Sequence, residues 1–599
     1  MKIAKFQSFE QASSPQKGPS RLAALRAEME LEKLDGFIVP RSDMYQGEYV
    51  SPKDERLAWL TGFTGSAGFC VALKKNAAVF VDNRYTVQVK AQTLEAFTAV
   101  DWPQKTLEAW LIDNAEEGAK IGFDPWLHTL DAIEKAQIAV SPFGITLERT
   151  DNLIDRIWQD QPDTPKEPAF SFDLKYAGKS ADDKLSEISS LLRDEKQEAM
   201  VITLPEDIAW LLNIRGSDVD HVPLVHCLGI LACDGQFDLF IDEEKTASIR
   251  NTLPDQVNLH PLTRFEQALT RLCSPVRVDA RSLPYAVALC LQKANVRTSK
   301  SDNPISLPKA CKNQVEIAQA RISHRRDGAV MCDFLAWLDT QTLGELTEID
   351  VAIALEELRR RNLELLDISF DTISASGPNA AIPHYRVTRQ SNRILRSGEV
   401  MLVDSGGQYL DGTTDITRTV AIGGQSKEVC EAFTRVLKGM IAVSKLTFPA
   451  GTKGQEIDSY ARTALWAVGQ DFGHGTGHGV GQFLSVHEGP QRISRADGPA
   501  FAEGMIVSNE PGFYKEGYFG IRTENLLLVQ KADFEHNSQF FKFETLTHVP
   551  IDKRMIVKDL LNLEEIIWIN DYHSVCLKLH LAQVTPQTAE WLRQATEPI

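Results

Sequence analysis

The first 300 residues contain the same order of apolar and polar positions twice. Residues 22–29 and residues 185–192 carry apolar side chains at the spacing of an amphipathic helix. Each is followed by a short apolar run, at 36–39 and at 200–203, of the kind that forms a buried strand. The pattern therefore predicts a helix followed by a strand in each half of this region.

Two short motifs repeat in the same order. Glu-Arg-Leu-Ala-Trp-Leu at 55–60 is echoed by Glu-Asp-Ile-Ala-Trp-Leu at 206–211. Further on, Val-Phe-Val-Asp at 79–82 is echoed by Leu-Phe-Ile-Asp at 239–242. A solenoid needs at least about three repeats, so two copies predict two related α/β domains.

Proline and helix signals divide the chain. Residues 160–168 contain three prolines, which disfavour a helix and predict a linker. A long helical pattern begins at residue 313 and continues through Trp337, and mixed strands and helices follow to about residue 550. Residues 560–579 predict one or two helices in a tail. We expect an α/β (α+β) protein with domains at 1–160, 161–302 and 303–599, the tail spanning about 555–599.

Two aspartates border a predicted hairpin in the third domain. Asp404 closes the apolar run 399–403, and Asp415 opens the β-branched run 416–420. The residues between them, 405–414, are rich in glycine and other turn formers. A hairpin here would bring the two carboxylates together.

Three further residues complete a candidate metal-binding set. His478 lies in the run Gly-His-Gly-Thr-Gly-His-Gly-Val-Gly at 473–481, where alternating glycines allow close approach of the backbone. Glu510 and Glu524 each lie between strand-like runs. Four carboxylates and one imidazole form a hard ligand set that favours Mn, Co, Fe or Mg. If they converge, Asp404, Asp415, His478, Glu510 and Glu524 could hold two divalent ions.

Other catalytic motifs are incomplete. His487 and Glu488 begin like the H-E-x-x-H zinc motif, but position 491 is Gln. The glycine-rich run contains neither the dinucleotide fingerprint nor the P-loop pattern. Ser66 does not match the G-x-S-x-G nucleophile elbow.

Composition narrows the class of protein. The 599 residues are 43% hydrophobic and 24% charged, which is typical of a globular protein. Acidic side chains outnumber basic ones by 82 to 64, giving a net charge of −18 that disfavours nucleic acid and anionic membranes as partners. There is no long apolar segment and no apolar run of signal-peptide length at the start. Nine scattered cysteines without a C-x-x-C pair favour reduced thiols, so we expect a cytoplasmic protein.

Several segments together resemble a known family. Their order, spacing and local sequence are similar to those of the dinuclear metallopeptidases of the pita-bread fold, which include methionine aminopeptidase, prolidase and aminopeptidase P. The resemblance is greatest to the large three-domain Xaa-Pro aminopeptidases and covers nearly the whole chain. The segments that carry it are VDSGGQYLDGTTDITRT, HGTGHGVGQFLSVHEGP, VSNEPGFY and FGIRTENL.

The resemblance implies a role for each metal ligand. Asp415 and Glu524 would bridge two divalent ions, Asp404 would complete the shell of one, and His478 with Glu510 the shell of the other. Mn²⁺ is the expected metal, with Co²⁺ or Zn²⁺ as alternatives. Two such ions could lower the pKa of water from ~15.7 toward ~7 and stabilise a tetrahedral oxyanion.

The resemblance also implies how a peptide would be bound and cleaved. Glu510 would act as general base, and His384 and His487 would orient the scissile carbonyl and the leaving side. Phe370, Tyr385 and Tyr514 would form apolar walls for a proline ring. The implied substrate-binding residues are His384, His474, His487, Arg522, Phe370 and Tyr514.

The two N-terminal domains show no convergent set of titratable side chains, so we expect them to serve as scaffold. Asp43, Tyr45 and Arg84 are candidates for helping to shape the pocket. The expected activity is release of the N-terminal residue from peptides with proline in second position. A prolidase acting on X-Pro dipeptides is the alternative, although prolidases are usually shorter by one repeat. A non-enzymatic scaffold of the same fold, such as a histone-chaperone subunit, would lose the metal ligands, and all five are present.

The chain departs from the family at two places near the site. Thr523 stands where an apolar or β-branched residue is usual. Positions 386–389, Arg-Val-Thr-Arg, replace the shorter, proline-bearing sequence expected after the family's His-Tyr. The larger enzymes of this family form homodimers through the catalytic domain, and the apolar tail is suited to such a contact. The resemblance therefore implies a homodimer.

Overall fold

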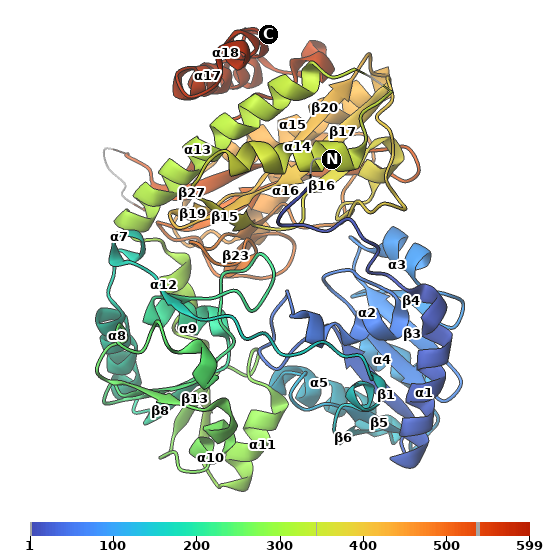
Figure 1. Ribbon diagram of the computed structural model, residues 1–599, viewed down its shortest axis with the longest axis vertical. Helices are drawn as coiled ribbons and strands as arrows, with labels where there is room; N and C mark the ends of the chain where they lie inside the picture. Colours follow the sequence, from blue (N-terminus) through green and yellow to red (C-terminus); the bar gives the residue numbers. More distant parts are fainter. Residues whose placement is uncertain (1–2, 343, 535–538) are drawn as a thin grey trace. The chain divides into compact units, whose positions relative to one another are not determined.

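The computed structural model describes residues 3–342, 344–534 and 539–599 of the chain. It consists of two compact units (Figure 1). The N-terminal unit comprises Ala12–Leu174 and Lys179–Ile305. The C-terminal unit comprises Ser306–Ile599 together with two short segments from earlier in the chain, Met1–Gln11 and Lys175–Gly178.

The N-terminal unit contains two six-stranded sheets with the same topology. Their strand orders are β4-β3-β2-β1-β5-β6 and β12-β11-β10-β8-β13-β14. In each sheet the strand that follows the first helix pairs antiparallel with one neighbour and parallel with the other. The predicted duplication is thus confirmed at the level of topology. The strands of the first sheet are β1 (Gly36–Pro40), β2 (Phe69–Leu73), β3 (Ala77–Val81), β4 (Thr98–Asp101), β5 (Lys120–Phe123) and β6 (Thr146–Arg149). Those of the second are β8 (Ala199–Ile202), β10 (Leu228–Ala232), β11 (Phe237–Phe240), β12 (Val257–His260), β13 (Val276–Val278) and β14 (Thr298–Lys300).

Each sheet is covered by the helix that the apolar spacing predicts. Helix α1 (Gly18–Leu31) buries Leu22, Leu25 and Met29. Helix α8 (Ala181–Asp194) has Ser180 as its N-cap and buries apolar residues at the same spacing. The segment at 160–168 between the two domains forms no helix or strand, as its prolines predict.

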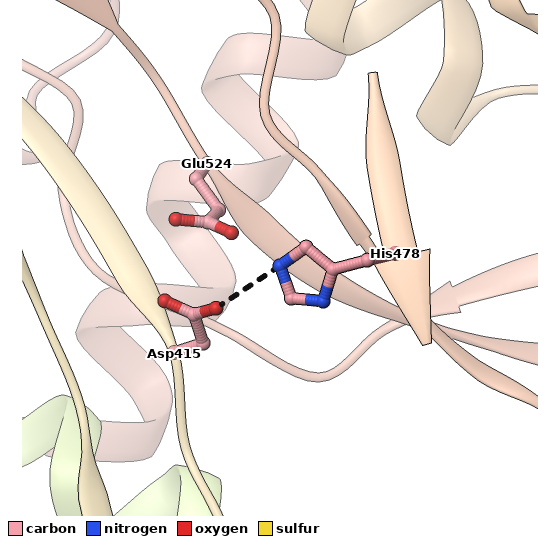
Figure 2. Close-up of side chains that lie close together, drawn as sticks. All are labelled: Asp415, His478 and Glu524. Carbon is pink, nitrogen blue, oxygen red and sulfur yellow. Dashed lines mark ion pairs between the residues drawn. The ribbon is translucent and has the colours of Figure 1, made fainter. Parts of the chain in front are cut away.

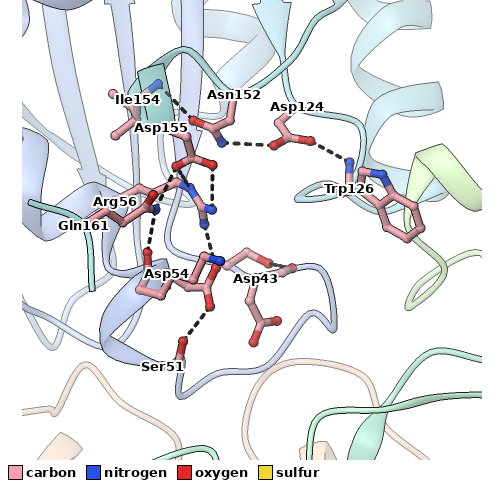
Figure 3. A network of polar contacts seen from close by, with 12 residues as sticks. Asp43, Ser51, Asp54, Arg56, Asp124, Trp126, Asn152, Ile154, Asp155 and Gln161 are labelled. Atoms are coloured by element: carbon pink, nitrogen blue, oxygen red, sulfur yellow. Dashed lines mark hydrogen bonds and ion pairs between the residues drawn. The ribbon is translucent and has the colours of Figure 1, made fainter. Parts of the chain in front are cut away.

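A buried arginine ties the first domain together (Figure 3). Arg56 donates two hydrogen bonds to the Asp155 carboxylate, at 2.7 and 3.0 Å, and a third to Asp54 at 2.8 Å. Gln161, in the linker, also donates to Asp155 at 3.0 Å. The linker is therefore held against the domain by polar contacts as well as by chain connectivity.

The C-terminal unit begins with the long predicted helix. Helix α13 (Gln314–Asp339) starts at a capping box in which Asn313 and Glu316 satisfy each other's backbone N–H groups. It packs against α14 (Glu348–Arg360), and α14 in turn packs on β16 (Ile373–Ser376). Helices α15 (Lys427–Ser444) and α16 (Gly454–Trp466) pack on each other and share one apolar core with the largest sheet.

The strands of this unit position the predicted site residues. The predicted hairpin is present: β17 (Glu399–Ser405) pairs antiparallel with β20 (Ile416–Ile422), and Asp404 lies opposite Thr417. The largest sheet has the order β21-β28-β27-β24-β22-β23. Its strands are β21 (Thr447–Pro449), β22 (Gly477–Gly479), β23 (Glu488–Ile493), β24 (Ile506–Asn509), β27 (Asn525–Lys531) and β28 (Phe540–Thr545). The remaining strands are β15 (Leu365–Ile368), β18 (Gly407–Tyr409), β19 (Gly412–Thr413), β25 (Gly512–Lys515) and β26 (Phe519–Arg522).

The tail forms the predicted helices. Helix α17 (Leu563–His580) buries Ile569, Tyr572 and Cys576 in the core of the unit, and α18 (Pro586–Ala595) packs on α13. Over the residues that the structure describes, no helix is both long enough and apolar enough to cross a membrane.

Candidate metal centre

Three of the five predicted metal ligands converge in the C-terminal unit (Figure 2). Asp415 precedes β20, His478 lies in β22, and Glu524 lies between β26 and β27. One potential ligand atom from each lies within 4.8 Å of the other two. Strands distant in sequence thus bring together two carboxylates and an imidazole, which is a ligand set for a divalent ion.

His478 is oriented by its own backbone surroundings. Its Nδ1 lies 2.9 Å from the carbonyl oxygen of Gly479, so Nε2 is left to face the carboxylates. Nε2 lies 3.5 Å from Asp415 and 3.5 Å from the predicted ligand Glu510, which follows β24. The neighbouring glycines are needed for close packing: a Cβ on Gly477 would lie 1.9 Å from the carbonyl oxygen of Ser508.

Asp404 and Glu524 each direct one oxygen to a protein donor and keep the other unpaired. Asp404 accepts from Arg522 at 2.6 Å, and Glu524 accepts from the Thr417 hydroxyl at 2.8 Å. Their remaining oxygens are buried and have no hydrogen-bond donor among the described residues. Because an unpaired buried carboxylate oxygen is costly, these two atoms fit a site built for cations.

The electrostatics of the cluster also fit bound cations. Burial raises the pKa of Glu524 well above its usual value, and the Asp415 and Glu510 carboxylates raise it further. Burial likewise raises the pKa of Asp404 to about 7, against the opposing effect of Arg522. Burial alone would lower the pKa of His478, but Asp415 and Glu510 raise it to about 9. Divalent ions would relieve this repulsion between carboxylates.

The predicted substrate histidines lie beside the cluster. The rings of His478 and His487 have centroids 4.3 Å apart, and His384 stacks near His487 at 6.5 Å. His474 is connected to the cluster through other side chains, and its Nε2 lies 2.8 Å from the Tyr514 hydroxyl. Arg522 donates to that hydroxyl at 2.7 Å and to Asp404. His474, Tyr514 and Arg522 are therefore linked to a predicted metal ligand.

Two of the residues predicted to form apolar walls for a proline ring lie in different environments. Phe370 is half-buried between β15 and β16. Tyr385 is 5% exposed, and its hydroxyl donates to Glu348 at 3.0 Å. Tyr385 thus contributes to the packing of the fold.

The N-terminal candidates Asp43, Tyr45 and Arg84 lie in the other unit. Asp43 and Tyr45 are buried, and Tyr45 stacks on His226 with ring centroids 4.4 Å apart. Arg84 forms an ion pair with Asp82 at 2.6 Å.

Two residues that support the site could not be identified from the sequence. In α16, Arg462 forms a buried ion pair with Asp458 and donates to the carbonyl oxygen of His474 at 2.8 Å. Asp458 accepts from the Thr476 hydroxyl at 2.7 Å, so the pair holds the glycine-rich loop that carries His478. Their spacing of four residues on one helix face is the only available signal, and it is common on helices without any such role.

Comparison with family models assigns every domain. The model of metallopeptidase family M24 matches residues 318–531, and that of the C-terminal region of this peptidase group matches 539–599. The creatinase/prolidase N-terminal domain matches twice, at 21–157 and at 160–316. The α/β class with two related N-terminal domains and a pita-bread domain is confirmed.

Individual relatives align from end to end. A probable Xaa-Pro aminopeptidase P of Ajellomyces dermatitidis is 36% identical and covers 97% of this chain and 99% of its own. Aminopeptidase P1 of Arabidopsis thaliana is 35% identical over 94% of this chain and 97% of its own. The crystal structure of X-prolyl aminopeptidase from Caenorhabditis elegans, a cytosolic enzyme with a dinuclear active site, has a TM-score of 0.92 at 34% identity and covers 97% of this chain and 100% of its own. This chain therefore belongs to the Xaa-Pro aminopeptidases P of metallopeptidase family M24.

Proposed function

We propose that this protein is a dinuclear-metal aminopeptidase that hydrolyses the first peptide bond of substrates with proline in second position. The observation that carries the proposal is the cluster of Asp415, half-buried His478 and Glu524 in a chain that aligns end to end with such enzymes. Buried oxygens on Asp404 and Glu524 that have no donor among the described residues support the same conclusion.

Each side chain has a role in this proposal. Asp404, Asp415, His478, Glu510 and Glu524 would hold the two ions, which would supply a nucleophile at neutral pH and polarise the scissile carbonyl when bound. Glu510 acts as general base. His384 and His487, half-buried beside His478, orient the scissile carbonyl and the leaving side. The remaining residues proposed to contact the peptide are His474, Arg522, Phe370 and Tyr514.

A proline in second position suits such an enzyme. An X-Pro bond is a tertiary amide without an N–H, so peptidases that bind that hydrogen cannot recognise it. A site that recognises the scissile carbonyl and the free amine does not need the N–H.

The length of this chain argues against the prolidase alternative. The prolidase from Pyrococcus horikoshii covers only 62% of this chain while 99% of its own chain is aligned, at 26% identity and a TM-score of 0.50. This chain has two such N-terminal domains, and the aminopeptidases P align with it from end to end.

The finer assignments complete the proposal. We propose Mn²⁺ as the metal, in keeping with the oxygen-rich ligand set, and a cytoplasmic location, in keeping with nine free cysteines. Domain boundaries at 160 and 302 and a homodimer are also proposed.

A peptide panel tests the function. The purified protein, stripped of metal and then given Mn²⁺, should release X from X-Pro-Y tripeptides and act poorly on X-Ala-Y and on X-Pro dipeptides. Acetylation of the peptide's N-terminal amine should stop cleavage, because an acidic site is suited to binding a free amine. Faster hydrolysis of the dipeptide than of the tripeptide would favour prolidase, and full activity in protein shown to lack metal would refute the proposal.

A further inference from the structure

The loop that carries His384 has little structure of its own. Between η6 (Gly377–Ala381) and β17, residues 382–393 form neither helix nor strand. The position of the imidazole therefore depends on what the loop packs against. Two sets of contacts hold this loop, and one of them comes from the start of the chain.

The inner contact is the buried carboxylate of Glu348 at the start of α14. It accepts from the Tyr385 hydroxyl at 3.0 Å, from the Asn379 side chain at 3.0 Å and from the Arg393 N–H at 3.1 Å. Tyr385 follows His384 directly, so this carboxylate fixes one side of the histidine.

The outer contact is the segment 5–10, which belongs to the C-terminal unit although it is more than 300 residues away in sequence. The carbonyl oxygen of Phe9 accepts from the Arg389 N–H at 2.8 Å. The side-chain carbonyl of Gln7 accepts from the Thr372 N–H at 2.9 Å. Glu356, a buried residue of α14, accepts from the N–H groups of Lys5 and Phe6.

The Phe9 ring anchors this segment. It is 8% exposed and packs in a cluster that includes Tyr385 and Val387 from the His384 loop and Ile353 from α14. Val387 packs in the same cluster as the Phe9 ring, and the Arg389 N–H donates to the Phe9 carbonyl oxygen. The loop therefore contacts the N-terminal segment within residues 387–389.

We propose that residues 5–10 form a strap, anchored by Phe9, that positions His384 for the peptidase reaction. The inference rests on the proposed function, in which His384 orients the substrate. Phe9 is 375 positions from His384, touches no predicted ligand and acts only by holding the loop, so it is a positioning residue.

A double-mutant cycle in the full-length, Mn²⁺-loaded protein tests the strap. Phe9→Ala should lower kcat/KM for an X-Pro-Y tripeptide about tenfold or more, with metal content unchanged. Its thermal midpoint should fall in both backgrounds, because a buried ring is removed. In a His384→Ala background the same substitution should have little further effect, because the strap then has no histidine to position. Phe9→Leu should restore most of the activity. Ile3→Ala, at a residue that precedes the strap and is 74% exposed, should leave the activity unchanged.

Two results would overturn the strap. One is unchanged kcat/KM in folded Phe9→Ala protein, and the other is an equal loss in both backgrounds, which would indicate a general structural effect. If Phe9→Ala does not fold, Gln7→Ala, which removes only the acceptor for the Thr372 N–H, must show the same dependence on His384. If the wild-type protein cleaves no X-Pro-Y peptide, the proposed function fails. Amide hydrogen exchange then tests the strap by itself: the amides of residues 382–393 must exchange faster in Phe9→Ala than in wild type.

Discussion

At the scale of single residues, burial and mutual repulsion both disfavour the charged form of carboxylates in the cluster. Asp415 is 4% exposed, and it raises the pKa of Glu524 beyond the effect of burial. We expect Asp415→Asn to lose most bound metal by elemental analysis, because a proposed anionic ligand is replaced by a neutral amide. In chelator the same variant should melt above the wild type, because one repelling charge is gone. A control substitution, Asp163→Asn at an exposed residue, should change neither quantity. A metal-free variant less stable than metal-free wild type would contradict this account.

The two histidines beside the cluster should behave differently from the ligands. His384→Ala and His487→Ala are expected to retain metal while kcat falls by roughly 10²–10⁴, the usual value of a positioned acid–base or hydrogen-bonding group. Elemental analysis and steady-state kinetics on the same samples separate the two effects. Loss of metal from either folded variant would place that histidine among the ligands instead.

How much of the site could be predicted from sequence depends on the range of the interactions. Asp404 and Asp415 could be placed because they lie at the ends of two strands that pair, and His478 because its glycines indicate a close backbone approach. Glu348 and Phe9 could not, because their partners are set by tertiary packing. Phe9 reads as an ordinary apolar residue until the fold brings residue 389 against it.

At the scale of elements, α17 contains a buried histidine that should make the folded protein less stable at acidic pH. His573 Nε2 accepts a hydrogen bond from the Ile551 N–H at 3.1 Å, which requires the neutral ring. Burial lowers the pKa of His573 to about 4. Because the unfolded ring titrates near 6.5, stability should fall as the pH drops below about 6.5, by about 3 kcal/mol at pH 4 from this residue.

A comparison of thermal midpoints measures this effect. Wild-type protein should lose stability between pH 7 and pH 4.5, and His573→Gln should lose less over the same interval while being less stable at pH 7. Burial also lowers the pKa of nearby His548 to about 4, so part of the acid sensitivity should remain. An identical pH dependence in the two proteins would refute the role of His573.

At the scale of the whole molecule, the outer face of α17 offers a contact surface. Leu563 is 72% exposed, Ile567 50% and Val575 38%, while Ile569 and Tyr572 on the opposite face are buried in the core. Truncation at about residue 554 should therefore give monomer or aggregate, since it removes core packing as well as the outer face.

Point variants separate the two roles of the tail helix. If the outer face forms the proposed two-fold contact, Leu563→Glu with Ile567→Glu should yield a folded monomer, because burying two charges at an apolar interface without partners is costly. Leu363→Glu, at a residue that is 94% exposed in the same unit, is the matched control and should leave the assembly unchanged. Light scattering at micromolar concentration measures the mass of each protein. A wild-type mass near 66.8 kDa, that of one chain, would exclude the homodimer, whereas a dimeric double variant would move the interface away from α17.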